Sequence, residues 1–431
     1  MEIKELAKQA KQASIQLAAV DPELKNQALK EIALMLKARS NDIITANQED
    51  IARSESQNLA TPLLKRLKYD DSKIKESIDG LNSLIMLPEP TGETLTATEL
   101  DKGLELYKVS CPIGVIGVIF ESRPDALVQI SSLCLKSSNA VILKGGSEAQ
   151  KTNKILAEII TLATDKIGIP KGWLQLIETR SDVNEMLTCD KYIDLIIPRG
   201  SNDFVKYIMA HSSIPVLGHA DGICHVYIDK EADLEMAVKV ATDSKCQYVA
   251  VCNATETILV HSAIASSFLP QLKKSLDSFN VEIFGCEKTA AIISVQAANE
   301  TTWKNEYLDY KVSVKVVHDI IEAINHINQY GSGHTESIIT QNSKTASQFM
   351  KLIDSGNVFW NASTRFSDGF RYGLGAEVGV STNKIHARGP VGMEGLLIYK
   401  WLLKGNGHIV GDYASGKKSF THEKLNKKFT I

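Results

Sequence analysis

The sequence predicts an α/β protein with two domains, each built on a parallel β-sheet, and a β-hairpin arm. Three observations lead to this prediction: a helical first part, a segment that alternates between polar and apolar residues, and two series of short apolar runs separated by helical stretches. The chain has 431 residues, of which 44% are hydrophobic, so it contains enough apolar material for two or three buried cores.

Helices are expected over most of the first 90 residues. Asp21 can cap a helix that starts at Pro22, because proline suits the first helical position. The apolar residues that follow recur at helical spacing: Leu24, Ala28, Leu29, Ile32 and Leu36. The pattern breaks near 87–92, and residues 93–109 then alternate as a pair of exposed strands does, which predicts the hairpin arm.

Two series of short apolar runs indicate buried parallel strands joined by helices. The first series comprises 115–120, 140–143, 174–177, 193–197 and 214–217. The second series comprises 225–228, 257–260, 312–317, 337–340 and 357–360. Ligands of such sheets lie beyond the carboxyl ends of the strands, so the residues directly after each run are the first candidates for a site.

The composition argues against several kinds of partner. A formal charge of -3 gives no broad positive field for a nucleic acid, and no stretch approaches the roughly 20 apolar residues of a membrane helix. The first five residues carry acids and a lysine where a signal peptide has a short basic region. The seven cysteines are odd in number and scattered, which is typical of free thiols in a reducing cytoplasm.

Two turns between a predicted strand and a predicted helix are candidates for cofactor binding. At Lys144-Gly145-Gly146-Ser147, free backbone amides and a helix N-terminus suit phosphate, and the lysine suits a ribose hydroxyl or a 2′-phosphate. A purely structural turn is the alternative, since no G-x-G-x-x-G fingerprint is present. At Arg199-Gly200-Ser201, the arginine can grip phosphate or carboxylate and the serine can cap the next helix.

Cys252 differs from the other cysteines because it lies in a polar loop, between a predicted helix and a predicted strand of the second domain. A partly exposed thiolate in such a loop can act as a nucleophile. Cys134 and Cys224 lie in or next to apolar elements and are expected to be packing residues.

No metal site is expected. Two histidines, His219 and His225, flank Asp221 and Cys224, but their spacing matches no familiar ligand pattern. The other histidines are scattered, and the sequence contains no H-E-x-x-H motif.

The segment 373–400, GLGAEVGVSTNKIHARGPVGMEGLLIYK, resembles the signature of the γ-glutamyl phosphate reductase family, part of the aldehyde dehydrogenase superfamily. Other stretches agree with this family in its order: GVIGVIFESRPDALVQI, NAVILKGGSEA, VLGHADGICHVYID, CNATETILVH, YGSGHTESIIT and NASTRFSDGFRYG. The resemblance covers nearly the whole chain, from about 5 to 408.

The resemblance implies an aldehyde dehydrogenase-like fold, with two parallel-sheet α/β domains and a β-hairpin oligomerisation arm. Residues 1–226 would form the NADPH-binding domain, with the arm at 93–109. Residues 227–388 would form the catalytic domain, and residues 389–431 would return to the cofactor domain or the oligomer interface.

Cofactor residues are implied by position. Lys144 matches the lysine near the adenosine ribose, in the turn with Gly145, Gly146 and Ser147. The pair Gly200-Ser201 matches the turn beside the cofactor, and Glu306 matches the acid that holds the nicotinamide ribose.

Catalytic and substrate residues are implied in the same way. Cys252 matches the nucleophile, and Ser122 stands where hydrolytic aldehyde dehydrogenases have an oxyanion-hole asparagine. Gly218-His219 stands where those enzymes have the glutamate that activates water, and this departure fits acyl-phosphate chemistry. Arg123, Arg388 and Asn253 are candidates for binding the substrate, with structural ion pairing as the alternative for the two arginines.

The implied reaction is the NADPH-dependent reduction of L-glutamyl 5-phosphate to L-glutamate 5-semialdehyde through a thioester on Cys252, in proline synthesis from glutamate. The alternatives are a hydrolytic or CoA-acylating aldehyde dehydrogenase, and an inactive scaffold for glutamate 5-kinase. A cytoplasmic homodimer or homotetramer is expected, and association with glutamate 5-kinase is a further expectation.

Overall fold

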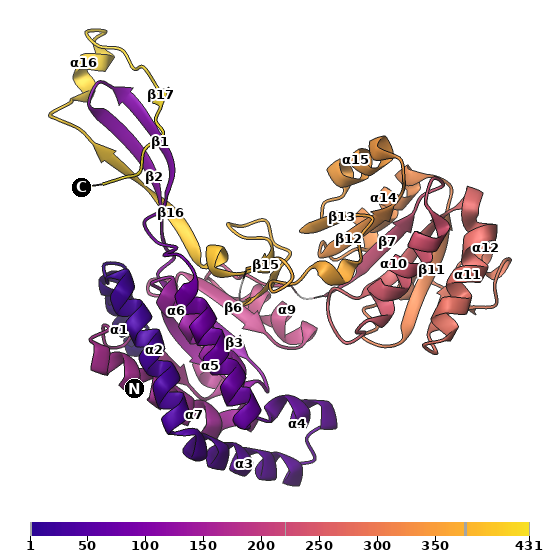
Figure 1. Ribbon diagram of the computed structural model, residues 1–431, viewed down its shortest axis with the longest axis horizontal. Coiled ribbons are helices and arrows are strands. Elements are labelled where there is room, and N and C mark those ends of the chain that lie inside the picture. Colours follow the sequence, from indigo (N-terminus) through magenta and orange to yellow (C-terminus); the bar gives the residue numbers. More distant parts are fainter. Residues whose placement is uncertain (1, 220, 375–376, 431) are drawn as a thin grey trace. The chain divides into compact units, whose positions relative to one another are not determined.

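The computed structural model describes residues 2–219, 221–374 and 377–430, and its chain divides into two compact units (Figure 1). The first unit comprises Met1–Gly200, Tyr207–Leu217 and Val391–Ile431. The second unit comprises Ser201–Lys206 and Gly218–Pro390. None of the helices in the described part of the chain is both long enough and apolar enough to cross a membrane.

The first unit begins with five helices and continues into a four-stranded parallel sheet of order β5-β4-β3-β6. The strands are β3 (Val115–Phe120), β4 (Ala140–Lys144), β5 (Leu174–Ile177) and β6 (Leu195–Arg199). The helices are α1 (Ile3–Leu17), α2 (Pro22–Ala38), α3 (Ser40–Ser56), α4 (Thr61–Leu67), α5 (Asp71–Met86), α6 (Pro124–Lys136), α7 (Gln150–Ile167) and α8 (Arg180–Met186). Helix α9 (Asn202–His211) starts in the second unit, and its part from Tyr207 onward belongs to the first unit. Helix α2 begins as expected, because the Asp21 side chain accepts the Glu23 amide and Pro22 occupies the first turn.

Strand order places the helices of the first unit. Helices α6 and α7 connect strands that advance in one direction across the sheet, so right-handed crossovers put both on one face, where they pack together. The chain then crosses back to β6, which puts α8 on the other face, where α1 packs against it. Each strand is thereby covered on both sides, and this explains why β3 is buried along its whole length.

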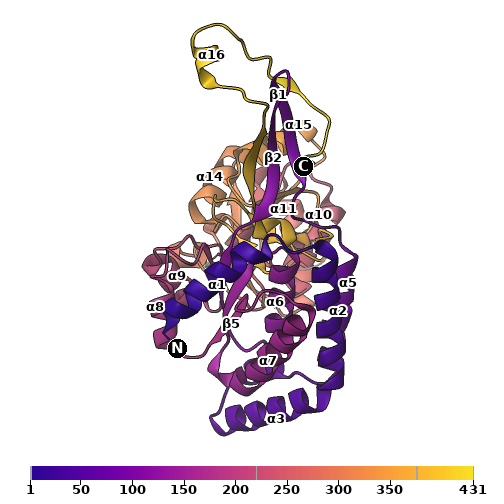
Figure 2. The same ribbon diagram turned by 90° about the vertical axis from the view of Figure 1, so that its left-hand side faces the viewer.

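The hairpin 93–109 exists as an antiparallel sheet of order β16-β2-β1-β17. Its strands are β1 (Thr94–Asp101), β2 (Leu104–Pro112), β16 (Leu397–Lys404) and β17 (Glu423–Lys424), with the short helix α16 (Val410–Ala414) between the last two. Figures 1 and 2 both show this arm projecting from the rest of the first unit. The C-terminal segment therefore returns to the first unit by adding strands to the hairpin.

The second unit is built on a seven-stranded parallel sheet of order β10-β9-β11-β8-β7-β12-β13. The strands are β7 (Cys224–Ile228), β8 (Thr255–His261), β9 (Glu282–Gly285), β10 (Gln296–Ala297), β11 (Lys311–Val317), β12 (Thr335–Ile339) and β13 (Asn357–Trp360). The helices are α10 (Leu234–Cys246), α11 (Ala265–Asp277), α12 (Glu287–Ala290), α13 (Glu300–Trp303), α14 (Ile320–Tyr330) and α15 (Ser343–Leu352). Short strands β14 (Gly379–Ser381) and β15 (Gly389–Val391) follow.

Alternating residues of the central strands belong to two separate hydrophobic cores of the second unit. Val226 and Ile228 of β7 pack on the face covered by α10 and α11, whereas Tyr227 packs on the face covered by α14 and α15. Strand side chains point to opposite faces in turn, so an uninterrupted apolar run is what a strand buried on both faces requires.

The structure confirms the aldehyde dehydrogenase-like fold class and corrects three details. Strand β7 begins before residue 226 and pairs with β8 and β12, so it belongs to the second unit. The run 214–217 makes only a single bridge, between Ile196 and Val216, because Pro215 has no amide hydrogen to extend a ladder. Strands β9 and β10 were not expected: both are short, and β10 lies at the edge of the sheet.

Candidate active site

Cys252 lies in the loop between α10 and β8 of the second unit, and its side chain is half-buried. The loop is tied to the 3₁₀ turn η3 (Thr364–Phe366) on its far side: the Thr364 hydroxyl donates to the Asn253 carbonyl over 2.7 Å. The Asn253 side-chain amide in turn donates to the Ser367 carbonyl over 2.7 Å. These bonds fix the backbone that carries the thiol.

A close approach of two backbones fixes Cys252 from the opposite direction. A Cβ added at Gly222 would lie 2.3 Å from the Cys252 carbonyl oxygen and 2.4 Å from its Cα. Only glycine allows this contact, because real Cβ atoms do not approach other atoms so closely. The buried thiol of Cys224 also donates to the Cys252 carbonyl, over 3.2 Å.

A buried ion pair joins the two ends of the nucleophile loop. Lys245, in the last turn of α10, and Glu256, at the start of β8, are both fully buried, with 2.7 Å between Nζ and Oε2. Burial raises the pKa of Glu256 to about 7, and Lys245 acts in the opposite direction. Removing one partner of such a pair leaves an uncompensated charge, which typically costs about 3–5 kcal/mol.

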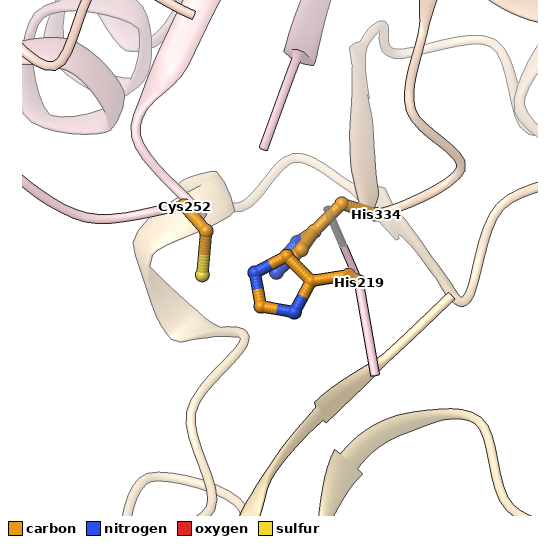
Figure 3. A group of neighbouring side chains, drawn as sticks. All are labelled: His219, Cys252 and His334. Atoms are coloured by element: carbon orange, nitrogen blue, oxygen red, sulfur yellow. The ribbon is translucent and has the colours of Figure 1, made fainter. Parts of the chain in front are cut away.

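Two imidazoles accompany the thiol. The Cys252 Sγ and a ring nitrogen of each of His219 and His334 lie within 4.8 Å of one another. Figure 3 shows a nitrogen of His219 turned toward the sulfur, with the His334 ring beside them. All three residues precede parallel strands, namely β7, β8 and β12, which are neighbours in the sheet. Their amino ends therefore meet at one edge and bring the three side chains together.

Hydrogen bonds orient both imidazoles, and for His219 the bond also sets the tautomer. His219 Nδ1 lies 3.0 Å from the Val380 carbonyl oxygen, which only accepts, so Nδ1 carries the hydrogen of the neutral ring. The nitrogen that faces the cluster is then Nε2, the ring nitrogen without a hydrogen. His334 is fully buried, its Nδ1 lies 2.8 Å from the Thr335 hydroxyl, and burial holds its pKa well below the usual value, so this ring is neutral.

Arg365 in turn η3 brings a positive charge to the nucleophile. Its Nε donates to the Gln247 side chain over 2.9 Å, within the same loop region as Cys252. Burial and the nearby Arg371 lower the pKa of Arg365, whereas the negative charge of the Cys252 thiolate raises it. A guanidinium so placed can stabilise a thiolate or hold an anionic group of a substrate.

His334 and Arg365 were not predicted as site residues. Site residues were expected directly after strands, whereas His334 precedes a strand and Arg365 lies in a turn. Both lie in segments that carry the family resemblance, YGSGHTESIIT and NASTRFSDGFRYG, and that is the only signal that points to them.

The predicted cofactor turn of the first unit has a cradle made possible by glycine. A Cβ at Gly145 would lie 2.1 Å from Asn153 Nδ2, and one at Gly146 would lie 1.9 Å from Glu148 Oε1. Both glycines line a small pocket with Ser147, and the buried Oδ1 of Asn153 has no hydrogen-bond partner among the described residues. This turn fits a dinucleotide for three reasons. Its two glycines leave the backbone open, Lys144 lies at the end of β4, and the Asn153 oxygen has no partner among the described residues.

The predicted oxyanion residue, Ser122, forms hydrogen bonds with Glu148 in this structure. Ser122 has φ of +41°, is buried, and donates both its amide and its hydroxyl to Glu148 Oε1 over 2.6 Å. Its neighbour Arg123 makes a partly exposed ion pair of 2.9 Å with Asp125. The predicted roles of both residues stay predictions.

The second predicted cofactor turn leads into helix α9, as expected, and the cofactor roles of its residues stay predictions. Ser201 follows Gly200 and its carbonyl accepts the amide of Val205, so it begins helix α9. The adjacent Asn202 donates its side-chain amide to Glu306 Oε2 over 2.6 Å. Burial raises the pKa of Glu306, and the bond from Asn202 acts in the opposite direction.

The predicted substrate residues of the second unit make structural contacts. Arg388 uses all three of its guanidinium nitrogens, on the Asp354 carboxylate at 3.3 Å, the Asp354 carbonyl at 3.1 Å and the Thr382 carbonyl at 3.3 Å. The amide nitrogen of Asn253 is bound to Ser367, and its buried Oδ1 has no partner among the described residues. Structural pairing, the alternative considered for Arg388, is the arrangement observed.

Comparisons with known proteins agree with this fold and site. The model of the aldehyde dehydrogenase family matches residues 1–300. The chain is 67% identical to a γ-glutamyl phosphate reductase of Acetivibrio thermocellus, over 100% of both chains. It is 64% identical to one of Pelotomaculum thermopropionicum, over 100% of this chain and 99% of that one. The crystal structure of γ-glutamyl phosphate reductase from Thermotoga maritima superposes with a TM-score of 0.93 at 40% identity, covering 95% of this chain and 100% of that chain.

The parallel-sheet units and the cysteine loop thus define an aldehyde dehydrogenase, a class of oxidoreductases that use a nicotinamide cofactor. Within this class, the chain belongs to the γ-glutamyl phosphate reductase family, which confirms the resemblance noted in the sequence.

Replacing Gly222 by alanine tests the close approach that positions Cys252. The added Cβ forces the two backbones apart, and overpacking of this kind typically costs about 1–3 kcal/mol of stability. Because a shift of about 1 Å at a reacting group can lower the rate about 100-fold, we expect kcat to fall at least tenfold. Steady-state kinetics and urea unfolding measure both effects.

The matched control is Gly80→Ala in helix α5, where no atom lies within 4 Å of the added Cβ. This variant should keep wild-type kcat, since alanine is a better helix former than glycine. Wild-type kcat in Gly222→Ala would show that Cys252 does not depend on the contact.

Proposed function

We propose that the chain reduces L-glutamyl 5-phosphate to L-glutamate 5-semialdehyde with NADPH, through a thioester on Cys252, as a step of proline synthesis from glutamate. The observation that carries this proposal is a half-buried thiol beside two neighbouring imidazoles, on a rigid loop of a chain with 67% identity to a γ-glutamyl phosphate reductase. A thiolate nucleophile is what acyl-phosphate chemistry needs.

The first step is the attack of the Cys252 sulfur on the γ-carbonyl carbon. His219 Nε2 accepts the thiol proton, and the positive charge of Arg365 favours the thiolate. The new C–S bond forms as the C–O bond to phosphate breaks, and inorganic phosphate leaves with the electron pair. Because phosphate is a good leaving group, no acid need protonate it.

The second step converts the thioester to the aldehyde. NADPH, when bound, supplies a hydride. The thioester carbonyl gains that hydride, and the resulting hemithioacetal breaks its C–S bond to release the aldehyde and regenerate the Cys252 thiolate. His219 occupies the place where hydrolytic aldehyde dehydrogenases have a glutamate, so no carboxylate base stands there to activate water against the thioester. The backbone amide of Cys252 is a candidate oxyanion donor, and such a donor is typically worth about 3 kcal/mol.

The reverse reaction tests the reaction class and the nucleophile together. With glutamate semialdehyde and NADP⁺, we expect steady formation of NADPH, followed by absorbance, only when inorganic phosphate is present. Cys252→Ala should lower the rate by at least about 1,000-fold, because it removes the group that forms the intermediate.

Cys246→Ala is the matched control, because this cysteine lies at the end of α10 and packs in the core. It should keep activity. Steady NADPH formation without phosphate would instead indicate a hydrolytic enzyme, and an active Cys252→Ala would exclude Cys252 as the nucleophile.

We propose NADPH as the preferred cofactor, with Lys144 beside the adenosine ribose and its 2′-phosphate. Gly145, Gly146 and Ser147 would then receive the backbone of the dinucleotide at the start of α7. A lysine favours the 2′-phosphate because it supplies a compact positive charge.

Lys144→Ala should raise the KM for NADPH by about tenfold, which corresponds to the loss of about 1.4 kcal/mol of binding free energy. The KM for NADH should rise much less, because NADH has no 2′-phosphate. Initial rates at varied cofactor concentration measure this. Lys151→Ala, an exposed lysine on α7 paired with Glu49, is the control and should change neither KM. Unchanged cofactor constants in Lys144→Ala would contradict the assignment.

We also propose that the chain forms a homodimer or homotetramer in the cytoplasm, where its free thiols persist. Strand β16 at the edge of the arm carries exposed Tyr399, Trp401 and Leu403, and an exposed edge strand is a ready site for pairing with another chain. Association with glutamate 5-kinase would protect the labile acyl phosphate.

Light scattering of the purified protein should give the mass of a dimer or tetramer, and Trp401→Lys should lower that mass by placing charge at the edge of the arm. Lys404→Glu, an exposed change on the same strand that removes no apolar surface, is the control. A wild-type monomer would contradict this proposal. Size exclusion of an equimolar mixture with glutamate 5-kinase tests the second association.

A further inference from the structure

The cluster formed by Cys252, His219 and His334 has the composition of a zinc site. Its sulfur and nitrogen atoms lie within 4.8 Å of one another, and Figure 3 shows them facing a common space. Tetrahedral Zn²⁺, with bonds of about 2.3 Å to sulfur and about 2.0 Å to nitrogen, holds its ligands roughly 3.5 Å apart. The three ligand atoms lie within 4.8 Å of one another, so the side chains would have to turn toward a shared ion to reach that separation.

A buried atom without a partner points into this cluster. His334 is fully buried, its Nδ1 is used by Thr335, and its Nε2 has no hydrogen-bond partner among the residues that the structure describes. An unsatisfied buried polar group typically costs about 1–3 kcal/mol. Coordination of a cation by Nε2 would remove that cost, because the cation would be the partner that this buried nitrogen lacks among the described residues.

The second imidazole has the outer contact that metal-binding histidines typically make. His219 uses Nδ1 on the Val380 carbonyl at 3.0 Å, which orients the ring and leaves Nε2 as the coordinating atom. One thiolate and two imidazoles suit Zn²⁺, whereas Mg²⁺ and Ca²⁺ prefer oxygen ligands.

We propose that Zn²⁺ binds to Cys252, His219 and His334 and thereby blocks the nucleophile reversibly. The Cys252 S–H bond breaks, the proton passes to solvent, and the sulfur lone pair forms the Zn–S bond, so no oxidant or reductant is consumed. A solvent or phosphate oxygen completes the tetrahedron. Inhibition rests on the proposed function of Cys252, whereas binding of the metal does not.

Equilibrium dialysis against Zn²⁺, in a buffer without thiols or chelators, tests the site directly. We expect one tightly bound Zn²⁺ per chain. Cys252→Ala and His219→Ala should each weaken binding by more than about tenfold, since even outer partners of metal ligands are worth 10–100-fold in affinity. His219 is half-buried, so its replacement is less disruptive than that of the buried His334.

The matched control is Cys286→Ala, because Cys286 is a half-buried thiol whose pKa is lowered by hydrogen bonds from Thr289 and Val316 although burial acts to raise it. It should bind Zn²⁺ as the wild type does. Equal Zn²⁺ affinity in the wild type, Cys252→Ala and His219→Ala would overturn the proposal, as would no binding by the wild type.

Activity and alkylation give the second readout. Zn²⁺ should inhibit the reductase and protect Cys252 from iodoacetamide, as peptide mass spectrometry detects, and EDTA should reverse both effects; Mg²⁺ at the same concentration should do neither. Zn²⁺ that binds at these residues without inhibiting would overturn the inhibitory role. The activity of Cys252→Ala without metal decides the proposed function separately.

Discussion

The contact between Gly222 and the backbone of Cys252 is the constraint on which the rest of the site depends. Because the contact leaves no room for a Cβ, it sets the distance between the nucleophile loop and the segment that leads into β7. The same segment carries His219 and Cys224, which reach the thiol and the carbonyl of Cys252 from this side. A wider separation would disconnect the thiol from the imidazole.

The other side of the loop is held by polar contacts that are almost entirely buried. Turn η3 binds Asn253 through Thr364 and Ser367, and the Lys245–Glu256 pair joins the helix before the loop to the strand after it. Preorganised polar groups in a dry environment lose little on reaction, because they need not reorient when charge develops. The thiol is thus presented by a rigid frame, as thioester chemistry requires.

Much of the fold was predictable because buried parallel strands leave a strong signal. Val115–Phe120 and Leu174–Ile177 were found with their bounds: β3 is buried along its whole length, and β5 is apolar apart from Gln175. Strands β9 and β10 lack that signal, because β9 alternates between half-buried and buried residues and β10 consists of two exposed residues at the sheet edge. The run 214–217 carries the signal but stops at a single bridge because of Pro215.

The site was predictable in part. The polar loop identified Cys252, and the glycines of the turn after β4 identified the candidate cofactor cradle, because both are local features. His334 and Arg365 are brought to Cys252 by strand order and by turn η3, which no local pattern encodes. Arg388 lies in the most specific sequence motif, and its guanidinium is bound to Asp354 and Thr382, contacts that the motif alone did not indicate; its role toward the substrate stays a prediction.

The most direct test of the account is to trap the thioester. In glutamate semialdehyde and NADP⁺ without phosphate, the hydride step proceeds and the acyl group has no acceptor, so peptide mass spectrometry should find a glutamyl adduct on the peptide that contains Cys252. Added phosphate should remove the adduct. A burst of NADPH with no adduct on Cys252, or an adduct on another cysteine, would contradict the central claim.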